Sequence, residues 1–185
     1  MEMPWEEKAG TILWSYYAGM ESGTALAGIL AGRINPSGKL AETFPRVYED
    51  TPTGHNGQFG RDDMVCYEEE IMVGYRHYEK NDILPMFCFG HGLSYTEFAY
   101  HDLQVKQDND AKDRVSISFD IENVGQIDGR EIVQIYVRDE ECTVIRPEKE
   151  LKAFKSIPLK AGSICRVEIT LDSMAFSFYD EKKHD

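Results

Sequence analysis

The sequence contains a run of closely spaced carboxylate side chains. Paired carboxylates can carry out acid–base or nucleophilic chemistry. Glu68, Glu69 and Glu70 are consecutive, and Asp62 and Asp63 precede them by a few residues. Adjacent acids repel each other, and on a strand Glu68 and Glu69 would point to opposite faces. We therefore interpret this run as solvated surface charge rather than as a reacting pair.

Three further side chains could act in a site, but each also has a structural interpretation. Glu21 precedes a predicted helix, where a carboxylate interacts favourably with the helix dipole and the free N–H groups. His91 lies between two glycines without a neighbour that would orient it, so we expect a packed or hydrogen-bonded histidine. Arg76 is flanked by Tyr75 and Tyr78, which predicts a guanidinium stacked on aromatic rings in an interdomain contact. No catalytic residue is assigned, because no Ser–His–Asp set or phosphate loop stands out.

Composition and charge exclude some classes of partner. The chain has 185 residues, of which 42% are hydrophobic and 29% charged, and this balance is typical of a globular protein. Its formal charge of −13 opposes binding to nucleic acid and to anionic membrane surfaces. An acidic surface rich in Tyr and Phe would suit a neutral polar substrate such as a sugar.

The cysteines argue against a metal site. The four cysteines are widely spaced and form no Cys-x-x-Cys pair, so neither zinc nor any other metal or cofactor is expected. We expect reduced thiols, which favour a cytoplasmic setting.

The sequence contains no apolar run of about 18 residues, as a membrane span would need, and Met1–Lys8 does not resemble a signal peptide.

The first half of the chain predicts a strand, a turn and a helix. Residues 9–17 form a short apolar run with aromatics, which predicts a buried strand. Residues 24–32 place Leu26, Ile29 and Leu30 at helical spacing and end on a glycine, a common helix stop. This order is typical of an open α/β sheet.

A polar loop and an aromatic stretch connect the two halves. Residues 46–66 are rich in Gly, Thr, Asn and Asp and predict a long surface loop, of a length usual for functional lids or for mobile loops. Residues 70–78 read as strand-like. In residues 85–98, Gly90 and Gly92 allow positive φ or close backbone approach, and the aromatics need a surface to pack on. We interpret 85–98 as a buried crossover between domains, with an ordinary strand–turn–strand as the alternative.

The second half changes to a period of two. Apolar and polar residues alternate over residues 115–121, and residues 133–137 and 167–171 repeat the pattern, which buries one face of each strand. Turns containing glycine separate these runs. Together they indicate a β-sandwich of immunoglobulin or fibronectin type III kind.

Short segments, spread over nearly the whole chain in a consistent order, carry a family resemblance. In the first half they are Gly19–Leu26, Asn35–Leu40, Thr43–Pro45, Val73–Tyr78 and Phe89–Thr96. In the second half they are Asn123–Gly125, Gly129–Val137 and Arg146–Phe154. The first set resembles the end of the α/β sandwich domain of glycoside hydrolase family 3 and the segments that follow it. The second set is similar to the fibronectin type III-like domain of that family.

The resemblance implies a fold and a division of the chain. The fold is expected to be α+β overall, a partial α/β sandwich segment followed by an immunoglobulin-like β-sandwich. Residues 1–45 would form the C-terminal end of the α/β sandwich domain, and residues 46–98 a long loop and interdomain crossover. Residues 99–185 would form the fibronectin type III-like sandwich, truncated at its C-terminus.

The resemblance also implies a parent enzyme, a retaining β-glycosidase similar to β-glucosidases that hydrolyses terminal β-linked glycosides. Such hydrolysis needs two carboxyl groups about 5–5.5 Å apart. In the family the nucleophile is an aspartate in a (β/α)8 barrel, and the acid/base is a glutamate upstream of the segment that Met3–Trp5 resembles. Neither segment is present in this sequence, so we expect a non-catalytic C-terminal fragment that is inactive alone.

Arg61 and Asp62 are the candidate substrate-binding residues. From the loop of residues 46–66 they could reach a neighbouring active site and hydrogen-bond sugar hydroxyls, whereas a surface ion pair is the alternative. The expected partners are the rest of the parent enzyme, its β-glucoside or oligosaccharide substrate, and a second copy in a homodimer. We expect neither nucleic acid nor membrane as a partner.

Two other functions remain open at this point. A free-standing binding module would hold carbohydrate or protein through exposed aromatics of the sandwich such as Tyr100 or Tyr136. A structural spacer would solubilise or dimerise its parent. A large exposed apolar patch on residues 9–44 would fit a truncated piece of an enzyme better than an autonomous spacer.

Overall fold

The computed structural model describes residues 2–57, 65–107 and 114–179, which fall into two compact units. The first unit comprises Met1–Ile34, Gly38–Leu93 and Arg138–Lys149. The second unit comprises Asn35–Ser37, Ser94–Val137 and Glu150–Asp185. The two units therefore interleave along the sequence. No helix in the described ranges is both long and apolar enough to cross a membrane.

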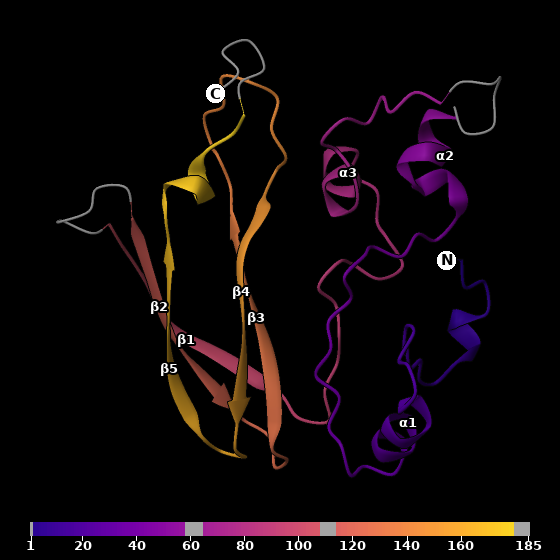
Figure 1. Cartoon of the computed structure of the whole chain (residues 1–185), viewed down its shortest axis with the longest axis vertical. Coiled ribbons are helices and arrows are strands. Elements are labelled where there is room, and N and C mark those ends of the chain that lie inside the picture. Colours follow the sequence, from indigo (N-terminus) through magenta and orange to yellow (C-terminus); the bar gives the residue numbers. More distant parts are fainter. Residues whose placement is uncertain (1, 58–64, 108–113, 180–185) are drawn as a thin grey trace. The chain divides into compact units, whose positions relative to one another are not determined.

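The second unit contains two antiparallel sheets (Figure 1). The strands are β1 (Phe98–Gln107), β2 (Val115–Asn123), β3 (Gly129–Val137), β4 (Glu150–Leu159) and β5 (Ile164–Leu171). One sheet has the order β1-β2-β5, and β3 pairs with β4 in the other. A 3-10 turn, η3 (Ser173–Phe176), follows β5. The predicted β-sandwich is confirmed, and so are the three strands predicted from alternation, which correspond to β2, β3 and β5.

The core of the second unit lies between these sheets. It gathers side chains from β2, β3, β4 and β5, and its least exposed members are Ile121 at 0% and Val133 and Val167 at 2% each. On β2, Ile117, Phe119 and Ile121 face inward, as the period of two predicts. Burial of these side chains is the main stabilising contribution to the unit, because each is worth about 1.5–3 kcal/mol.

A buried asparagine closes the end of the sandwich. Asn123 at the end of β2 is 0% exposed, and its Oδ1 accepts from the hydroxyl of Thr96 at 2.6 Å and from the amide of Gly125 at 3.1 Å. Its Nδ2 donates to the carbonyl oxygen of Ile127 at 2.8 Å and lies 3.4 Å from that of Leu159. A buried amide with all these partners avoids the penalty of an unsatisfied polar group and fixes three chain segments together.

Asn35 explains why residues 35–37 belong to the second unit. Its Oδ1 accepts from the hydroxyl of Ser94 at 2.9 Å and from the amide of Tyr95 at 2.8 Å. Its Nδ2 donates to the carbonyl oxygen of Asp128 at 3.0 Å. One short segment is thus tied to two distant parts of the chain by a single side chain.

The first unit is built from short helices joined by irregular chain. The helices are η1 (Glu6–Lys8), α1 (Ser22–Leu30), η2 (Tyr48–Asp50), α2 (Pro52–Asn56) and α3 (Tyr75–Lys80). The predicted helix over 24–32 is confirmed as α1, and Gly32 follows it with a φ of 69°, the left-handed conformation of a helix stop. Few side chains of this unit are buried, and the buried apolar ones include Met3, Phe44, Met72 and Tyr78.

The aromatic stretch at 85–93 pairs with residues 40–44 inside the first unit. The amide of Leu40 donates to the carbonyl oxygen of His91 at 2.8 Å, and the amide of Phe44 donates to that of Phe87 at 2.9 Å. Both glycine predictions are confirmed, each in a different way. Gly90 has a φ of 78°, whereas a Cβ on Gly92 would clash with the carbonyl oxygen of Gly38.

Two strand predictions in the first unit were wrong. Residues 9–17 form no strand; the ring of Trp14 instead packs edge-on against Phe44 with 5.3 Å between centroids. Residues 70–78 include a turn followed by α3, because Gly74 reverses the chain at a φ of 56° and the next residues bury His77 on one helical face. Both runs are short and mix aliphatic with aromatic residues, and a short run of this kind does not distinguish a strand from other buried segments.

The predicted loop over 46–66 is more ordered in its first part than its composition indicated. It contains η2 and α2, and the hydroxyl of Thr51 accepts a hydrogen bond from the amide of Gly54 as an N-cap. Pro52 occupies the first turn, and Gly57 ends the helix at a φ of 62°. These are the usual start and stop residues of a helix, and the sequence displays them.

Large apolar side chains are exposed along residues 5–34 of the first unit. Tyr17 and Met20 are almost fully exposed, and Leu30, on the face of α1 expected to pack, is 77% exposed. Trp5, Leu13, Tyr16 and Ile34 are exposed as well. Such a concentration is typical of a surface that another protein part covers.

Candidate functional site

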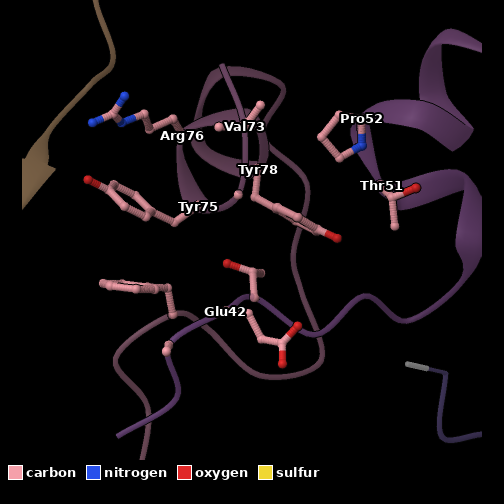
Figure 2. A pocket seen from close by; sticks show the side chains of 11 residues that line it. Glu42, Thr51, Pro52, Val73, Tyr75, Arg76 and Tyr78 are labelled. Atoms are coloured by element: carbon pink, nitrogen blue, oxygen red, sulfur yellow. The ribbon is translucent and has the colours of Figure 1, made fainter. Parts of the chain in front are cut away.

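The candidate site is a pocket of about 450 Å³ within the first unit. Figure 2 shows Thr51 and Pro52 on one side and the α3 residues Tyr75 and Arg76 on the other, with Tyr78 between them and Glu42 on the segment that crosses below Tyr78. Ala41, Thr43, Val73, Gly74 and Phe89 complete the lining. The volume lies within the range of about 300–1,000 Å³ that is usual for small-molecule sites.

One side of the pocket is aromatic. The rings of Tyr75 and Phe89 lie 5.1 Å apart between centroids, tilted by 31°. The guanidinium of Arg76 lies over the Tyr75 ring at 5.9 Å, and its Nη1 donates to the carbonyl oxygen of Ile71 at 3.4 Å. The predicted stacking of Arg76 on an aromatic ring is therefore confirmed for Tyr75.

Glu42, Thr43 and Tyr78 are among the oxygen-bearing side chains that line the pocket. Glu42 is exposed and, within the described residues, its carboxylate makes no hydrogen bond or ion pair. The Oγ1 of Thr43 is buried and has no hydrogen-bond partner in the described part of the chain. Burial, and after it the negative charge of Asp50, raises the pKa of the Tyr78 hydroxyl, which stays protonated and can donate. The pocket thus offers acceptors and a donor next to an apolar surface.

His77 connects the two sides of the pocket through a hydrogen bond. It lies on α3 with 3% of its surface exposed, and its Nε2 donates to the carbonyl oxygen of Asp50 at 3.1 Å, immediately before Thr51. The ring packs edge-to-face on that of His55 at 5.4 Å. Burial is the main cause that lowers the pKa of His77, so the imidazole is neutral near pH 7.

The residues predicted to act chemically do not gather in this pocket. Arg61 and Asp62, the predicted substrate-binding pair, lie outside the described residues, as does Asp63. Residues 68–70 form a turn rather than a strand, with Glu68 and Glu70 exposed. Glu21 occupies the N-cap position of α1 but makes no side-chain capping bond.

His91 and the sandwich tyrosines have structural surroundings. The ring of His91 stacks on Phe87 at 5.4 Å with a tilt of 24°, as a packed histidine would. Tyr100 is half-exposed, with its ring 5.8 Å from that of Phe119 and its hydroxyl donating to Glu131 at 3.3 Å. Burial, followed by the Glu131 charge, raises the pKa of Tyr100.

Sequence reasoning missed Glu42, Thr43 and Phe89 as pocket residues. They come from two segments far apart in the chain, which the pairing of residues 40–44 with 86–91 brings together. The sequence does show the aromatic and arginine residues of α3, but no local pattern joins them to Glu42.

Within the described ranges, no group of three or more His, Cys, Asp or Glu residues is arranged to hold a metal ion, and all four cysteines are free.

Two family-wide sequence profiles match the chain. The profile described as the glycosyl hydrolase family 3 C-terminal domain matches residues 1–95. The profile of a fibronectin type III-like domain matches residues 131–185. The two matches cover the helical first part and the portion of the β-sandwich from β3 onward, whereas β1 and β2 lie between them.

Similar proteins span nearly the whole chain. Thermostable beta-glucosidase B of Acetivibrio thermocellus is 46% identical over 100% of this chain and 24% of the relative. Beta-glucosidase BoGH3A of Bacteroides ovatus is 38% identical over 99% of this chain and 25% of the relative. This chain therefore spans about a quarter of the length of these relatives.

Solved structures agree with these matches. Beta-glucosidase 3B from Thermotoga neapolitana, in complex with glucose, superposes with a TM-score of 0.87 at 38% identity, over 95% of this chain and 25% of the other. The GH3 beta-glucosidase of Bifidobacterium adolescentis superposes with a TM-score of 0.91 at 37% identity, over 98% of this chain and 27% of the other.

Proposed function

Since this chain belongs to glycoside hydrolase family 3, we propose that it acts as the non-catalytic C-terminal part of a retaining β-glycosidase. In this role it supports catalytic parts that hydrolyse terminal β-linked glycosides, as the relatives named beta-glucosidase indicate. The observation that carries the proposal is the match of nearly the whole chain to one quarter of each relative.

The exposed apolar surface of residues 5–34 supports the same proposal. Tyr17, Met20 and Leu30 are large, apolar and more than three-quarters exposed. A covering partner would remove this area from water, which stabilises the complex by about 25 cal/mol per Å² before the cost of association. The rest of a family 3 enzyme, with its (β/α)8 barrel and the remainder of the α/β sandwich, is the partner proposed.

A chimera tests this function directly. The segment of the Acetivibrio thermocellus relative that this chain matches is replaced by this chain, and hydrolysis of an aryl β-glucoside is measured. We expect activity in the chimera, and none in this chain alone or in the relative without its matching segment. An inactive but folded chimera would contradict the proposal, and so would enzyme-like activity of this chain alone.

Matched variants test the docking surface. In the chimera, Tyr17→Ser and Leu30→Ser should lower the melting temperature and the activity together, because they weaken packing against the catalytic parts. Leu103→Ser is the control, since Leu103 is 68% exposed but belongs to the β-sandwich. Equal losses for all three variants would contradict the assignment of this surface.

Three finer points are part of the proposal. Residues 1–45, 46–98 and 99–185 would be the end of the α/β sandwich, the connecting region and the fibronectin type III-like domain. Arg61 and Asp62 would contact a β-glucoside or oligosaccharide, so alanine at either position in the chimera should raise KM more than it lowers kcat.

A homodimer would appear as a doubled mass in light scattering, and a monomer at all concentrations would contradict it.

A free-standing binding module is less well supported. Such a module would present a row of exposed aromatics on one sheet, but Tyr100 and Phe154, both more than half exposed, lie on different sheets. Tyr136 is half-buried, and its hydroxyl donates to Gln134 at 2.7 Å.

A further inference from the structure

We propose that acidic pH releases residues 46–57, the α2 segment, from α3, and that His77 is the side chain through which protons act. The α2 segment contains η2 and α2, and it carries Thr51 and Pro52, one side of the candidate pocket (Figure 2). Its release would separate that side from α3. This conformational response is independent of the proposed catalytic support, which rests on residues 5–34 and on the match to the relatives.

Two hydrogen bonds connect the α2 segment to other segments of the described chain. The amide of Tyr48 donates to the carboxylate of Glu2. The carbonyl oxygen of Asp50 accepts from Nε2 of His77 at 3.1 Å. The ring of His55 also packs edge-to-face on that of His77, with 5.4 Å between centroids. His77 therefore supplies one of the two hydrogen bonds and a ring contact as well.

The surroundings of His77 suit only the neutral ring. The residue is 3% exposed, and its Nδ1 lies 3.1 Å from Nδ2 of Asn81, an N–H donor. The same Nδ2 donates to the carbonyl oxygen of His77 at 2.9 Å, which fixes the orientation of the amide. A protonated imidazole carries N–H groups on both nitrogens, so the second one would face a donor in a place that water does not reach. The charged ring gains an acceptor when it moves out into water, and this movement breaks the contact with Asp50.

The titratable groups around His77 come from every element packed against it: Asp50 of η2, His55 of α2, Glu69 of the preceding turn, and Tyr78 and Lys80 of α3. Burial is the largest cause and lowers the pKa of His77, and the charges of His55 and Lys80 lower it further. The hydrogen bond to Asp50 and the charge of Glu69 raise it, but they do not offset burial. The balance of these groups thus agrees with the geometry at Nδ1.

The sign of the pH dependence follows from this difference between the two states. In the released state His77 is hydrated and binds its proton near the ordinary pKa of about 6.5. In the bound state it binds the proton only at lower pH. Binding of the α2 segment is therefore complete above pH 6.5 and weakens below it, by at most about tenfold per pH unit. Because this opening is local, the separate core of the β-sandwich should not respond to it.

Amide hydrogen exchange of the full chain, followed by NMR, tests the proposal. The amides of His55 and Gly57 report on the α2 segment, because they donate to the carbonyl oxygens of Thr51 and Thr53. We expect their protection factors, corrected for the intrinsic exchange rate, to fall about tenfold from about pH 7.5 to about pH 5. Protection in β2, the central strand of its sheet, should not change. Constant protection at Gly57, or an equal loss in β2, would overturn the proposal.

Variants connect the response to His77. His77→Gln keeps an N–H group that can donate to Asp50 but cannot become charged, so protection of α2 should no longer depend on pH. Asn81→Asp places an acceptor opposite Nδ1, so the charged ring can stay and the tenfold loss should disappear. His101→Gln is the control and should keep the loss, because His101 is a half-exposed histidine of the β-sandwich. A folded His77→Gln variant that still loses protection in acid would overturn the proposal, even where Asn81→Asp failed to fold.

Discussion

Asn81 donates a hydrogen bond from Nδ2 to Nδ1 of His77 over 3.1 Å, which leaves Nε2 of His77 as the protonated nitrogen. The same Nδ2 donates to the carbonyl oxygen of His77 at 2.9 Å, so the amide orientation is fixed. A second proton on His77 would therefore face an N–H group instead of an acceptor. The neutral ring, by contrast, has a partner on each nitrogen.

His77 should titrate below its ordinary pKa of 6.5, chiefly because burial disfavours the charged ring. Of the neighbouring charged groups, His55 and Lys80 lower the pKa, whereas Glu69 and the hydrogen bond to Asp50 raise it. As pH falls below 6.5 the unfolded chain binds a proton before the folded one does. The stability from His77 is thus complete above pH 6.5 and is lost below it, by at most about 1.4 kcal/mol per pH unit.

An NMR titration of the imidazole Cε1–H signals measures this directly. Asn81→Ala should move the midpoint of His77 upward, because it removes the donor that favours the neutral ring. A His77 midpoint at or above 6.5 in the unmodified chain would contradict the prediction.

Asn123→Ala should destabilise the β-sandwich by about 2–4 kcal/mol, because it leaves several buried groups without hydrogen bonds. Among these are the Thr96 hydroxyl and the carbonyl oxygen of Ile127. Ser116→Ala, an exposed position on the same strand β2, should change the free energy of unfolding by less than about 0.5 kcal/mol. Urea unfolding followed by far-UV circular dichroism compares the two variants, and similar values for both would disprove the role of Asn123.

The sequence predicted β2, β3 and β5 because their alternation is regular, and the two strands that it did not predict are irregular. In β1 the register shifts between His101 and Gln104, where Asp102 has a φ of 51°, so the alternation changes face midway. In β4 the extra residue is Lys152, since Ile135 of β3 pairs with Ala153 whereas the next residue, Tyr136, pairs with Leu151. A bulge adds one residue and breaks the period of two on which the prediction depends.

The first unit was harder to predict, for a different reason. The six residues of α3 are too few to show a helical period, and the helix depends on contacts of His77 with the distant residue Asp50. The pocket depends in turn on the pairing of Leu40 and Phe44 with residues 87–91. The stacking of Arg76 on an aromatic ring could be predicted from its sequence neighbours. The pairing of the distant segments that form the pocket could not be inferred from any local sequence pattern.

Gly92→Ala should destabilise the first unit by about 1–3 kcal/mol, because the new Cβ would clash with the backbone of Gly38, which cannot yield as a side chain does. Gly10→Ala is the control, since a Cβ there has no neighbour within 4 Å. Both tryptophans, Trp5 and Trp14, belong to the first unit, so tryptophan fluorescence during urea unfolding reports on it. Equal midpoints for the two variants would show that the close approach at Gly92 is not needed.

The segment Arg138–Lys149, which joins β3 to β4, offers a matched pair of ion pairs. Lys149 lies 2.6 Å from Glu79 of α3, and the Glu79 side chain is only 24% exposed, with its Oε2 buried and lacking a partner within the described residues. Arg138 lies 2.8 Å from Glu148, but these side chains are 62% and 52% exposed. Solvent screens the second pair much more than the first.

Lys149→Met should therefore lower the free energy of unfolding of the first unit by about 1 kcal/mol, because it leaves a mostly buried carboxylate without its cation. Arg138→Met should change it by less than about 0.5 kcal/mol, as is usual for exposed pairs. Tryptophan fluorescence during urea unfolding measures both variants, at low salt and at high salt. The Lys149 effect should persist at high salt. If it disappears there, or if Arg138→Met is equally damaging, the contact between Lys149 and Glu79 does not hold this segment to α3.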